Sequence, residues 1–350
     1  MDNTSELLRE TTRKLFAELT EPAMLRAAEQ GIFPASAWVA LETVGLHRAL
    51  VPEDAGGYGL PIADSLSLVR IAGEFALPLP LAETLLASWL LAGAGLEIPD
   101  GPLTLAPVTG EKLSLARAGT GWHLTGTVTR VPWGRNAIAA AVLAEQDGVF
   151  HVALVPAAAW RVEAGENMAR EPRDTLIFDA TLDGRSVGRA GISAAQLRLA
   201  GAAMRSLQIA GALTRITAMT TQYALERVQF GRPIGKFQAV QQNLAIMAGQ
   251  TAAAIAASDL AAEAFADGMR PLPIAAAKAR AGEAAGIGAG LAHQLHGAIG
   301  FTYEHSLHFF TKRLWSWRDE FGHETGWNLF LGRHMARAGA KNLWVELTAA

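Results

Sequence analysis

A stretch of polar and cationic residues lies where one long apolar pattern stops and another begins. It reads YALERVQFGRPIGKFQAVQ over residues 223–241, with Arg227 and Arg232 on either side of a glycine turn. A helix start presents unpaired backbone N–H groups, and a guanidinium binds phosphate oxygens through paired hydrogen bonds. The stretch therefore suits an anion such as a pyrophosphate. An ordinary helix–turn–helix with two solvated arginines would show the same spacing.

A second stretch, QLHGAIGFTYE over residues 294–304, closes another helical pattern. Its glycines lack a Cβ atom, so the backbone there can approach a ligand closely. Glycines also cap helix ends, so the same stretch is explained by a helix C-terminus alone. The sequence contains neither a P-loop nor a Gly-x-Gly-x-x-Gly fingerprint placed after a strand.

The composition excludes several classes of protein. Of the 350 residues 50% are hydrophobic and 18% are charged, with a net charge of −3. This rules out a disordered chain and leaves no basic field for nucleic acid. The absence of cysteine excludes disulfides, thiolate metal sites and a cysteine nucleophile. So little charge on so apolar a chain indicates a sizeable subunit interface.

The hydrophobic periodicity predicts three regions in the order helical, β, helical. Residues 1–100 read as helices, among them 34–44 and an apolar helix from Ala82, with the glycine-rich loop VPEDAGGYG at 51–59. Residues 101–190 alternate with a period of two and predict a small β-barrel or sandwich. From 191 to 350 the helical period returns, with helices expected at 193–228, 237–267 and 272–299. Their alanines and glycines permit close helix packing, as in a four-helix bundle.

The chain shows no secretory or membrane-spanning pattern. Residues 1–18 are charged throughout, and the longest apolar stretch, near 85–96, is shorter than the roughly 20 residues that span a bilayer. We therefore expect a cytoplasmic protein with no membrane span.

Taken together, the two stretches resemble the FAD-binding signatures of the acyl-CoA dehydrogenase family. The second is similar to the family's Gln-x-x-Gly-Gly-x-Gly-Phe motif, and VPEDAGGYGL with Asp64 and Glu74 resembles its N-terminal helical domain. The resemblance covers nearly the whole chain. It implies a mostly α fold with an N-terminal helical domain (1–100), a small central β-barrel (101–190) and a C-terminal four-helix bundle (191–350).

The resemblance also implies a chemistry: α,β-dehydrogenation of an acyl-CoA thioester. A carboxylate takes the proton from the α carbon while a hydride leaves the β carbon for FAD. No metal is implied. The expected partners are an acyl-CoA, an electron-transfer flavoprotein or similar acceptor, and further copies or a second kind of subunit in a dimer or tetramer. By similarity, the FAD contacts within the subunit are Arg227, Phe230, Gln238 and Gln241, and those from the neighbouring subunit are Gln294, His296, Gly297 and Gly300.

Three departures from the family pattern concern the flavin. The family's Thr-Glu-Pro-x-x-Gly-Ser-Asp stretch is replaced by LTLAPVTGEKLSLARAG, so the β domain looks trimmed. The Trp-Ile-Thr-Asn-Gly segment is replaced by residues 130–134, where Pro132 has no backbone N–H to donate. There Trp133 either stacks on a ring or packs in the core. Ala298 stands where the second glycine is usual.

A fourth departure concerns the base. The family's Tyr-Glu-Gly-Thr turn is replaced by RDEFGHE over residues 318–324. Counting forward from Gly300 places the base at Phe321, and counting back from Arg333 places it at Glu320. We take Glu320 as the expected catalytic base. The other possible acids are Asp319 and Glu324.

Three further interpretations concern the alternative slot for the base, the charges at 318–320 and the tryptophans. Some relatives carry the base on the first helix of the bundle, but the matching slots here, Ala195 or Gly201, hold no acid. The charges at 318–320 also suit a solvated cluster with no catalytic role. Trp315, Trp317 and Trp327 either line a bulky acyl pocket or pack helix against helix.

Three functions follow, in order of preference. The first is an FAD-dependent acyl-CoA dehydrogenase for a branched or polycyclic acyl group, similar to short subunits of heteromeric sterol-degrading dehydrogenases. The second is a non-catalytic partner subunit of such a heteromer. The third is a flavin oxygenase or oxidase on the same fold.

Overall fold

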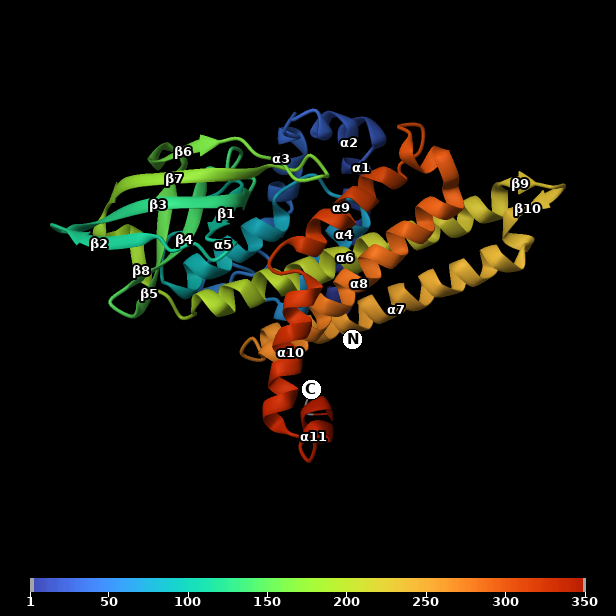
Figure 1. Ribbon diagram of the computed structural model, residues 1–350. Coiled ribbons are helices and arrows are strands. Elements are labelled where there is room, and N and C mark those ends of the chain that lie inside the picture. Colours follow the sequence, from blue (N-terminus) through green and yellow to red (C-terminus); the bar gives the residue numbers. More distant parts are fainter. Residues whose placement is uncertain (1–2, 349–350) are drawn as a thin grey trace. The chain divides into compact units, whose positions relative to one another are not determined.

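The computed structural model describes residues 3–348, and along the chain helices both precede and follow a set of strands (Figure 1). Contacts group the chain into two compact units. The bundle unit contains Met1–Pro22, Leu66–Leu77 and Ala202–Ala350, and the sheet unit contains Ala23–Ser65 and Pro78–Gly201. The three-domain division expected from the sequence stays a prediction.

The helices of the first hundred residues lie where the periodicity places them. They are α1 (Asn3–Leu19), α2 (Pro22–Glu29), α3 (Ala35–Thr43), α4 (Ile62–Glu74) and α5 (Leu81–Gly93). The turn after α3 needs Gly45, whose φ of +80° is a left-handed conformation that glycine adopts without strain. All but three residues of α5 are buried, which explains its nearly unbroken apolar sequence.

The central strands form one open sheet. They are β1 (Leu103–Ala106), β2 (Ser114–Ala118), β3 (Gly121–Pro132), β4 (Ala139–Gln146), β5 (Val149–Pro156), β6 (Trp160–Glu163), β7 (Arg173–Leu182) and β8 (Val187–Arg189). The strand order is β6-β7-β3-β2-β4-β5-β8, and β1 pairs in parallel with β4. Within the described residues the sheet does not close into a barrel, because no ladder joins the short end strands β6 and β8. Side chains of Trp122, Leu124 and Phe178 fill the core of this region.

The helices of the last 160 residues form the expected bundle. They are α6 (Ala194–Glu226), α7 (Gln238–Ala266), α8 (Pro271–His296), α9 (Leu307–Asp319), α10 (Glu324–Ala338) and α11 (Leu343–Thr348). Thr217 on α6 is hydrogen-bonded to Thr251 on α7 at 2.8 Å. A Cβ added at Gly211 of α6 would lie 1.9 Å from the Arg70 carbonyl oxygen of α4. Glycine is therefore required where these two backbones approach each other.

The helix α7 has an unusual surface. It is the one helix within residues 3–348 that is long and apolar enough to cross a membrane, by length and composition alone. Only 28% of its most apolar 18-residue window is buried. Much of its apolar surface therefore lies outside the core of this chain, which agrees with the subunit interface expected from the composition.

Candidate functional site

The first candidate stretch forms an exposed arm, residues 227–241, between α6 and α7. Its strands β9 (Val228–Gln229) and β10 (Arg232–Pro233) pair as an antiparallel ribbon. At the tip Phe230 has a φ of +53° and is 93% exposed. The ribbon extends beyond the ends of the two helices that carry it (Figure 1). An aromatic ring this exposed costs solvation free energy unless something outside the chain covers it.

The polar side chains of the arm are exposed as well. Arg227 is exposed, and the Arg232 guanidinium lies 4.3 Å from the centre of the Phe237 ring. The side chain of Gln241 donates to the Gly235 carbonyl oxygen at 3.0 Å, and Gln238 is exposed at the start of α7. The predicted set Arg227, Phe230, Gln238 and Gln241 therefore shares one solvent-facing segment, with two guanidinium groups available to an anion.

The second candidate stretch, the strip 294–300, forms the end of α8 and the turn that follows it. Gly297 ends the helix with φ +63° and ψ −144°, which only glycine adopts easily, and a Cβ there would meet nothing within 4 Å. Gly300 is buried, and a Cβ there would lie 3.1 Å from His296 Cβ. The strip thus combines backbone open to a ligand with a tightly packed turn.

The arm and the strip meet at one end of the bundle. The Tyr223 ring, four residues before Arg227, stacks on the His296 ring with centroids 4.4 Å apart and planes at 21°. The Tyr223 hydroxyl also donates to the His296 carbonyl oxygen at 3.4 Å. The strip therefore contacts α6 four residues before the first predicted residue of the arm. Contact of the strip with a flavin of a neighbouring subunit stays a prediction.

A group of stacked histidines lies behind the strip. His293 lies between Phe301 and Trp315, with ring centroids 4.0 and 5.5 Å away, and its Nε2 is hydrogen-bonded to Thr311 at 2.8 Å. Burial lowers the pKa of His293 and of His296. The Nδ1 of His293 and the Nε2 of His296 are buried and have no hydrogen-bond partner within residues 3–348. Such atoms cost free energy unless a bound molecule supplies the missing bond.

These histidines do not form a metal site. No group of three or more histidine, aspartate or glutamate side chains in the described part of the chain could hold a metal ion.

The turn that carries Glu320 has a different character, because its charges are paired within the chain. The Glu320 carboxylate lies 2.7 Å from Arg205 Nε, and the side chains of the two residues are 10% and 2% exposed. Arg205 also donates to the side chain of Gln208. Its guanidinium lies over the ring of Phe321, a residue whose backbone φ is +54°. Of the three charges at 318–320, Glu320 is therefore nearly buried, whereas the Asp319 side chain is 55% exposed.

A buried lysine holds the backbone of the same turn. Lys278 on α8 is fully buried, and its Nζ donates to the carbonyl oxygens of Arg318 at 2.6 Å and Gly322 at 2.9 Å. Burial lowers the pKa of Lys278 to about 7, although the nearby charges of Glu320 and Glu324 oppose that shift. The other two candidate acids also have basic neighbours. Glu324 is bonded to Arg318, and Asp319 lies 3.7 Å from His323.

Sequence reasoning missed Arg205 and Lys278. Each is a cation inside a largely apolar helical pattern: Arg205 in AGAAMRSLQIAGAL, and Lys278 in PIAAAKARAG, where Arg280 follows it. A cation on the apolar face of a helix is the signal that could have found them, because a charged side chain is buried only when it has a partner. Glu320 has a defined partner in the structure, and its role as catalytic base stays a prediction.

The tryptophans are part of the core or of the aromatic stack. Trp317 and Trp327 are buried, and the Trp327 indole donates to the Gly322 carbonyl oxygen at 3.2 Å.

In the sheet unit Trp133 is also buried, and its backbone N–H donates to the Pro172 carbonyl oxygen at 3.0 Å. This segment is fixed further by Arg135, which is hydrogen-bonded to the fully buried Asp174. The backbone N–H of Trp133 and the side chain of Arg135 are therefore used inside the sheet unit.

The sequence matches two family models along its length. They describe the N-terminal domain of acyl-CoA dehydrogenases, over residues 2–97, and the C-terminal domain of the same family, over residues 188–317. The chain is 33% identical over 330 residues to the acyl-CoA dehydrogenase IpdE2 of Mycobacterium tuberculosis, covering 88% of this chain and 90% of that protein.

Solved structures show the same fold. One is the ChsE4–ChsE5 complex from Mycobacterium tuberculosis, with 25% identity, a TM-score of 0.87, and coverage of 97% of this chain and 99% of the other. Another is the G363A variant of the steroid acyl-CoA dehydrogenase Tcur3481–Tcur3483, with 25% identity, a TM-score of 0.86, and coverage of 96% and 98%.

Proposed function

The chain belongs to the acyl-CoA dehydrogenase family, and from this we propose that it works in FAD-dependent α,β-dehydrogenation of an acyl-CoA as one subunit of a heteromer. One observation carries the proposal: the Tyr223 ring, on α6 just before the arm, stacks on the His296 ring of the strip with centroids 4.4 Å apart, which places the base of the arm against the strip. The arm and the strip together present cations, an exposed aromatic ring and open backbone. A dinucleotide has phosphates, which bind cations, and flat rings, which stack on an aromatic side chain.

The residues of the bundle end fit the dinucleotide part of FAD. Arg227 and Arg232 are exposed and suit the pyrophosphate, and Phe230 offers a ring face for stacking. The open backbone at Gly297 and the unpartnered Nε2 of His296 suit polar groups of the ligand. When bound, FAD supplies the acceptor for the hydride that leaves the β carbon.

The sheet unit supports the heteromeric form of the proposal. Its 130–136 segment, which takes the place of the family's flavin-facing segment, uses the Trp133 N–H and the Arg135 side chain for internal bonds. This chain then contacts a flavin whose ring lies against another subunit. The relatives ChsE4–ChsE5 and Tcur3481–Tcur3483 are themselves pairs of different chains.

The contacts of Glu320 in the turn at 318–322 bear on whether this chain or another subunit supplies the base. If Glu320 takes the α proton, it must do so from an ion pair with Arg205, 2.7 Å away, in which its own side chain is only 10% exposed. We favour the second candidate, in which this chain is the partner subunit and another chain supplies the base. The ion pair of Glu320 is the observation that favours it.

The substrate class is part of the proposal. We expect a branched or polycyclic acyl-CoA, as for the steroid acyl-CoA dehydrogenase among the structural neighbours. An electron-transfer flavoprotein or a similar acceptor is the expected oxidant of the reduced flavin. Localisation in the cytoplasm stays a prediction from the sequence.

The proposal is tested by purifying the chain alone and after co-expression with each acyl-CoA dehydrogenase-like chain of the same genome. Bound FAD is measured by absorbance, and dehydrogenation is measured with a dye acceptor. We expect bound flavin and activity in a co-purified pair. A fully active, flavin-loaded homo-oligomer would favour the self-sufficient enzyme, and a pair without flavin would contradict both forms.

A further inference from the structure

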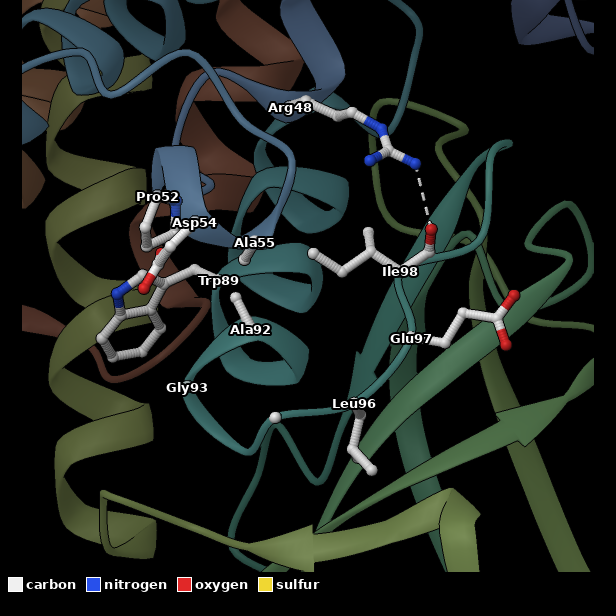
Figure 2. Close-up of a pocket in the computed structure, with 11 residues that line it drawn as sticks. Arg48, Pro52, Asp54, Ala55, Trp89, Ala92, Gly93, Leu96, Glu97 and Ile98 are labelled. Atoms are coloured by element: carbon white, nitrogen blue, oxygen red, sulfur yellow. Dashed lines mark hydrogen bonds between the residues drawn. The ribbon is translucent and has the colours of Figure 1, made fainter.

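A pocket in the sheet unit, remote in sequence from both signatures, is not used by the proposed reaction. It has a volume of about 510 Å³, within the range of ligand sites. The turn at 52–55, part of the VPEDAGG loop, forms one wall, and the end of α5 with residues 95–98 forms the other. Figure 2 shows the small side chains of Ala55 and Ala92 between these walls.

The charges that line the pocket are unbalanced. The only cation among the lining residues, Arg48, donates to the Ile98 carbonyl oxygen at 3.1 Å (Figure 2). It also donates to the Asp100 carboxylate at 2.8 Å. The carboxylates of Asp54 and Glu97 line the same pocket, and within residues 3–348 neither has a hydrogen-bond or ion-pair partner. An anionic ligand would meet two free carboxylates and no free cation. A cationic ligand would be attracted by both of these carboxylates.

Two further features favour a cation. The half-buried indole of Trp89 lies on the same side of the pocket as the Asp54 carboxylate (Figure 2), and an indole face attracts an ammonium or guanidinium group. In addition, α5 ends at Gly93 in the pocket wall. The carbonyl end of a helix carries about half a negative charge, which also favours a cation.

We propose that this pocket is a binding site for an organic cation: an ammonium or guanidinium group on an apolar carbon chain. The charged group lies between Trp89 and Asp54, and the carbon chain lies on Ala92 and Ile98. Glu97 adds to the negative field. Both a free small amine and an arginine or lysine side chain of a partner protein have this chemistry.

The test uses the full chain and isothermal titration with n-butylguanidinium, with the neutral isostere n-butylurea as the comparison. We expect saturable binding of the cation and none of the urea. The substitution Asp54→Asn is expected to weaken binding of the cation about fivefold or more, because it removes the charge at the cationic end. The matched control is Asp147→Asn, an exposed aspartate of the same unit outside the pocket, which leaves the affinity unchanged.

A second pair of variants blocks the space. A side chain added at Gly93 meets nothing within 4 Å, and this residue has no positive φ, so Gly93→Phe fills the pocket without strain in the fold. The control Gly191→Phe makes the same change at an equally open glycine outside the pocket. We expect binding to be lost in the first variant and kept in the second.

N-acetyl-arginine amide, compared with N-acetyl-citrulline amide, distinguishes the two sources of the cation. Tighter binding of the arginine amide than of butylguanidinium indicates a protein side chain, and the reverse indicates a free amine. The proposal is overturned if no cation saturates the site, if the urea binds equally, or if Asp147→Asn weakens binding as much as Asp54→Asn.

Discussion

The arm with the strip, and the turn at 318–322, are the two regions of the bundle unit where catalytic chemistry was expected, and they use their charged groups in opposite ways. The arm leaves Arg227 exposed and Phe230 93% exposed, and the strip buries the Nε2 of His296, which has no hydrogen-bond partner in the described part of the chain. In the turn, Glu320 is bonded to Arg205, and Lys278 donates to two backbone carbonyls. Unsatisfied groups indicate a ligand, whereas satisfied buried ones indicate a structural role.

The substitution with the largest expected effect on this contrast removes Arg205. We expect Arg205→Met to lower the free energy of unfolding by about 3–5 kcal/mol, because the nearly buried Glu320 carboxylate then loses its ion pair with the Arg205 guanidinium. Urea denaturation measures the change. The double variant Arg205→Met with Glu320→Gln removes both charges and is expected to regain much of the loss. If the single variant is as stable as the wild type, the ion pair is not structural.

The second test concerns the pH dependence of stability. The pKa of Lys278 is lowered from its ordinary value to about 7 in the folded state, so between about pH 7 and 10 the unfolded chain binds more protons than the folded chain. Stability therefore rises with pH in this window, at up to about 1.4 kcal/mol per pH unit. The control is Lys278→Met, which has no group to titrate. A constant difference between wild type and variant from pH 7 to 10 would refute the lowered pKa.

The third test is at the arm. We expect Arg227→Ala to weaken FAD binding about tenfold in the co-purified assembly, equivalent to about 1.4 kcal/mol, because a charge-assisted contact to phosphate is lost. Flavin released on dilution gives the affinity. Arg189→Ala, at an exposed arginine of β8, is the matched control and is expected to keep the flavin. Equal flavin content in both variants removes Arg227 from the site.

The smallest expected change in stability is at the tip of the arm. Because Phe230 is 93% exposed, Phe230→Ser is expected to alter the free energy of unfolding by less than about 0.5 kcal/mol. The same substitution should lower flavin retention or subunit assembly, measured by size-exclusion chromatography with absorbance detection. Met168→Ser, at a residue 61% exposed, is the control for loss of apolar surface alone. Normal assembly with normal flavin content would leave the exposed ring unexplained.

Much of the fold could be predicted from the sequence because local patterns determine it. The periodicity placed the long helices within a few residues of α6, α7 and α8, and Gly45 marked the end of α3. The openness of the sheet could not be predicted, because strand pairing joins residues far apart in the chain, and no local pattern shows which strands remain at the edges.

The site was only partly predictable for a related reason. The two signatures could be recognised, but the stacking of Tyr223 on His296 links residues 73 positions apart, and no spacing shows it. The partner of Glu320 is 115 positions away at Arg205. Counting along the chain selects candidates for a base, and only the packing shows which of them already has a partner.

The most direct test of the account is the dehydrogenation rate per bound flavin in the co-purified assembly carrying Glu320→Gln. The amide still offers an oxygen to Arg205, so the turn can keep its geometry. The account predicts a rate per flavin close to that of the wild type, because another subunit supplies the base. Loss of dehydrogenation with FAD still bound would contradict it and make Glu320 the base.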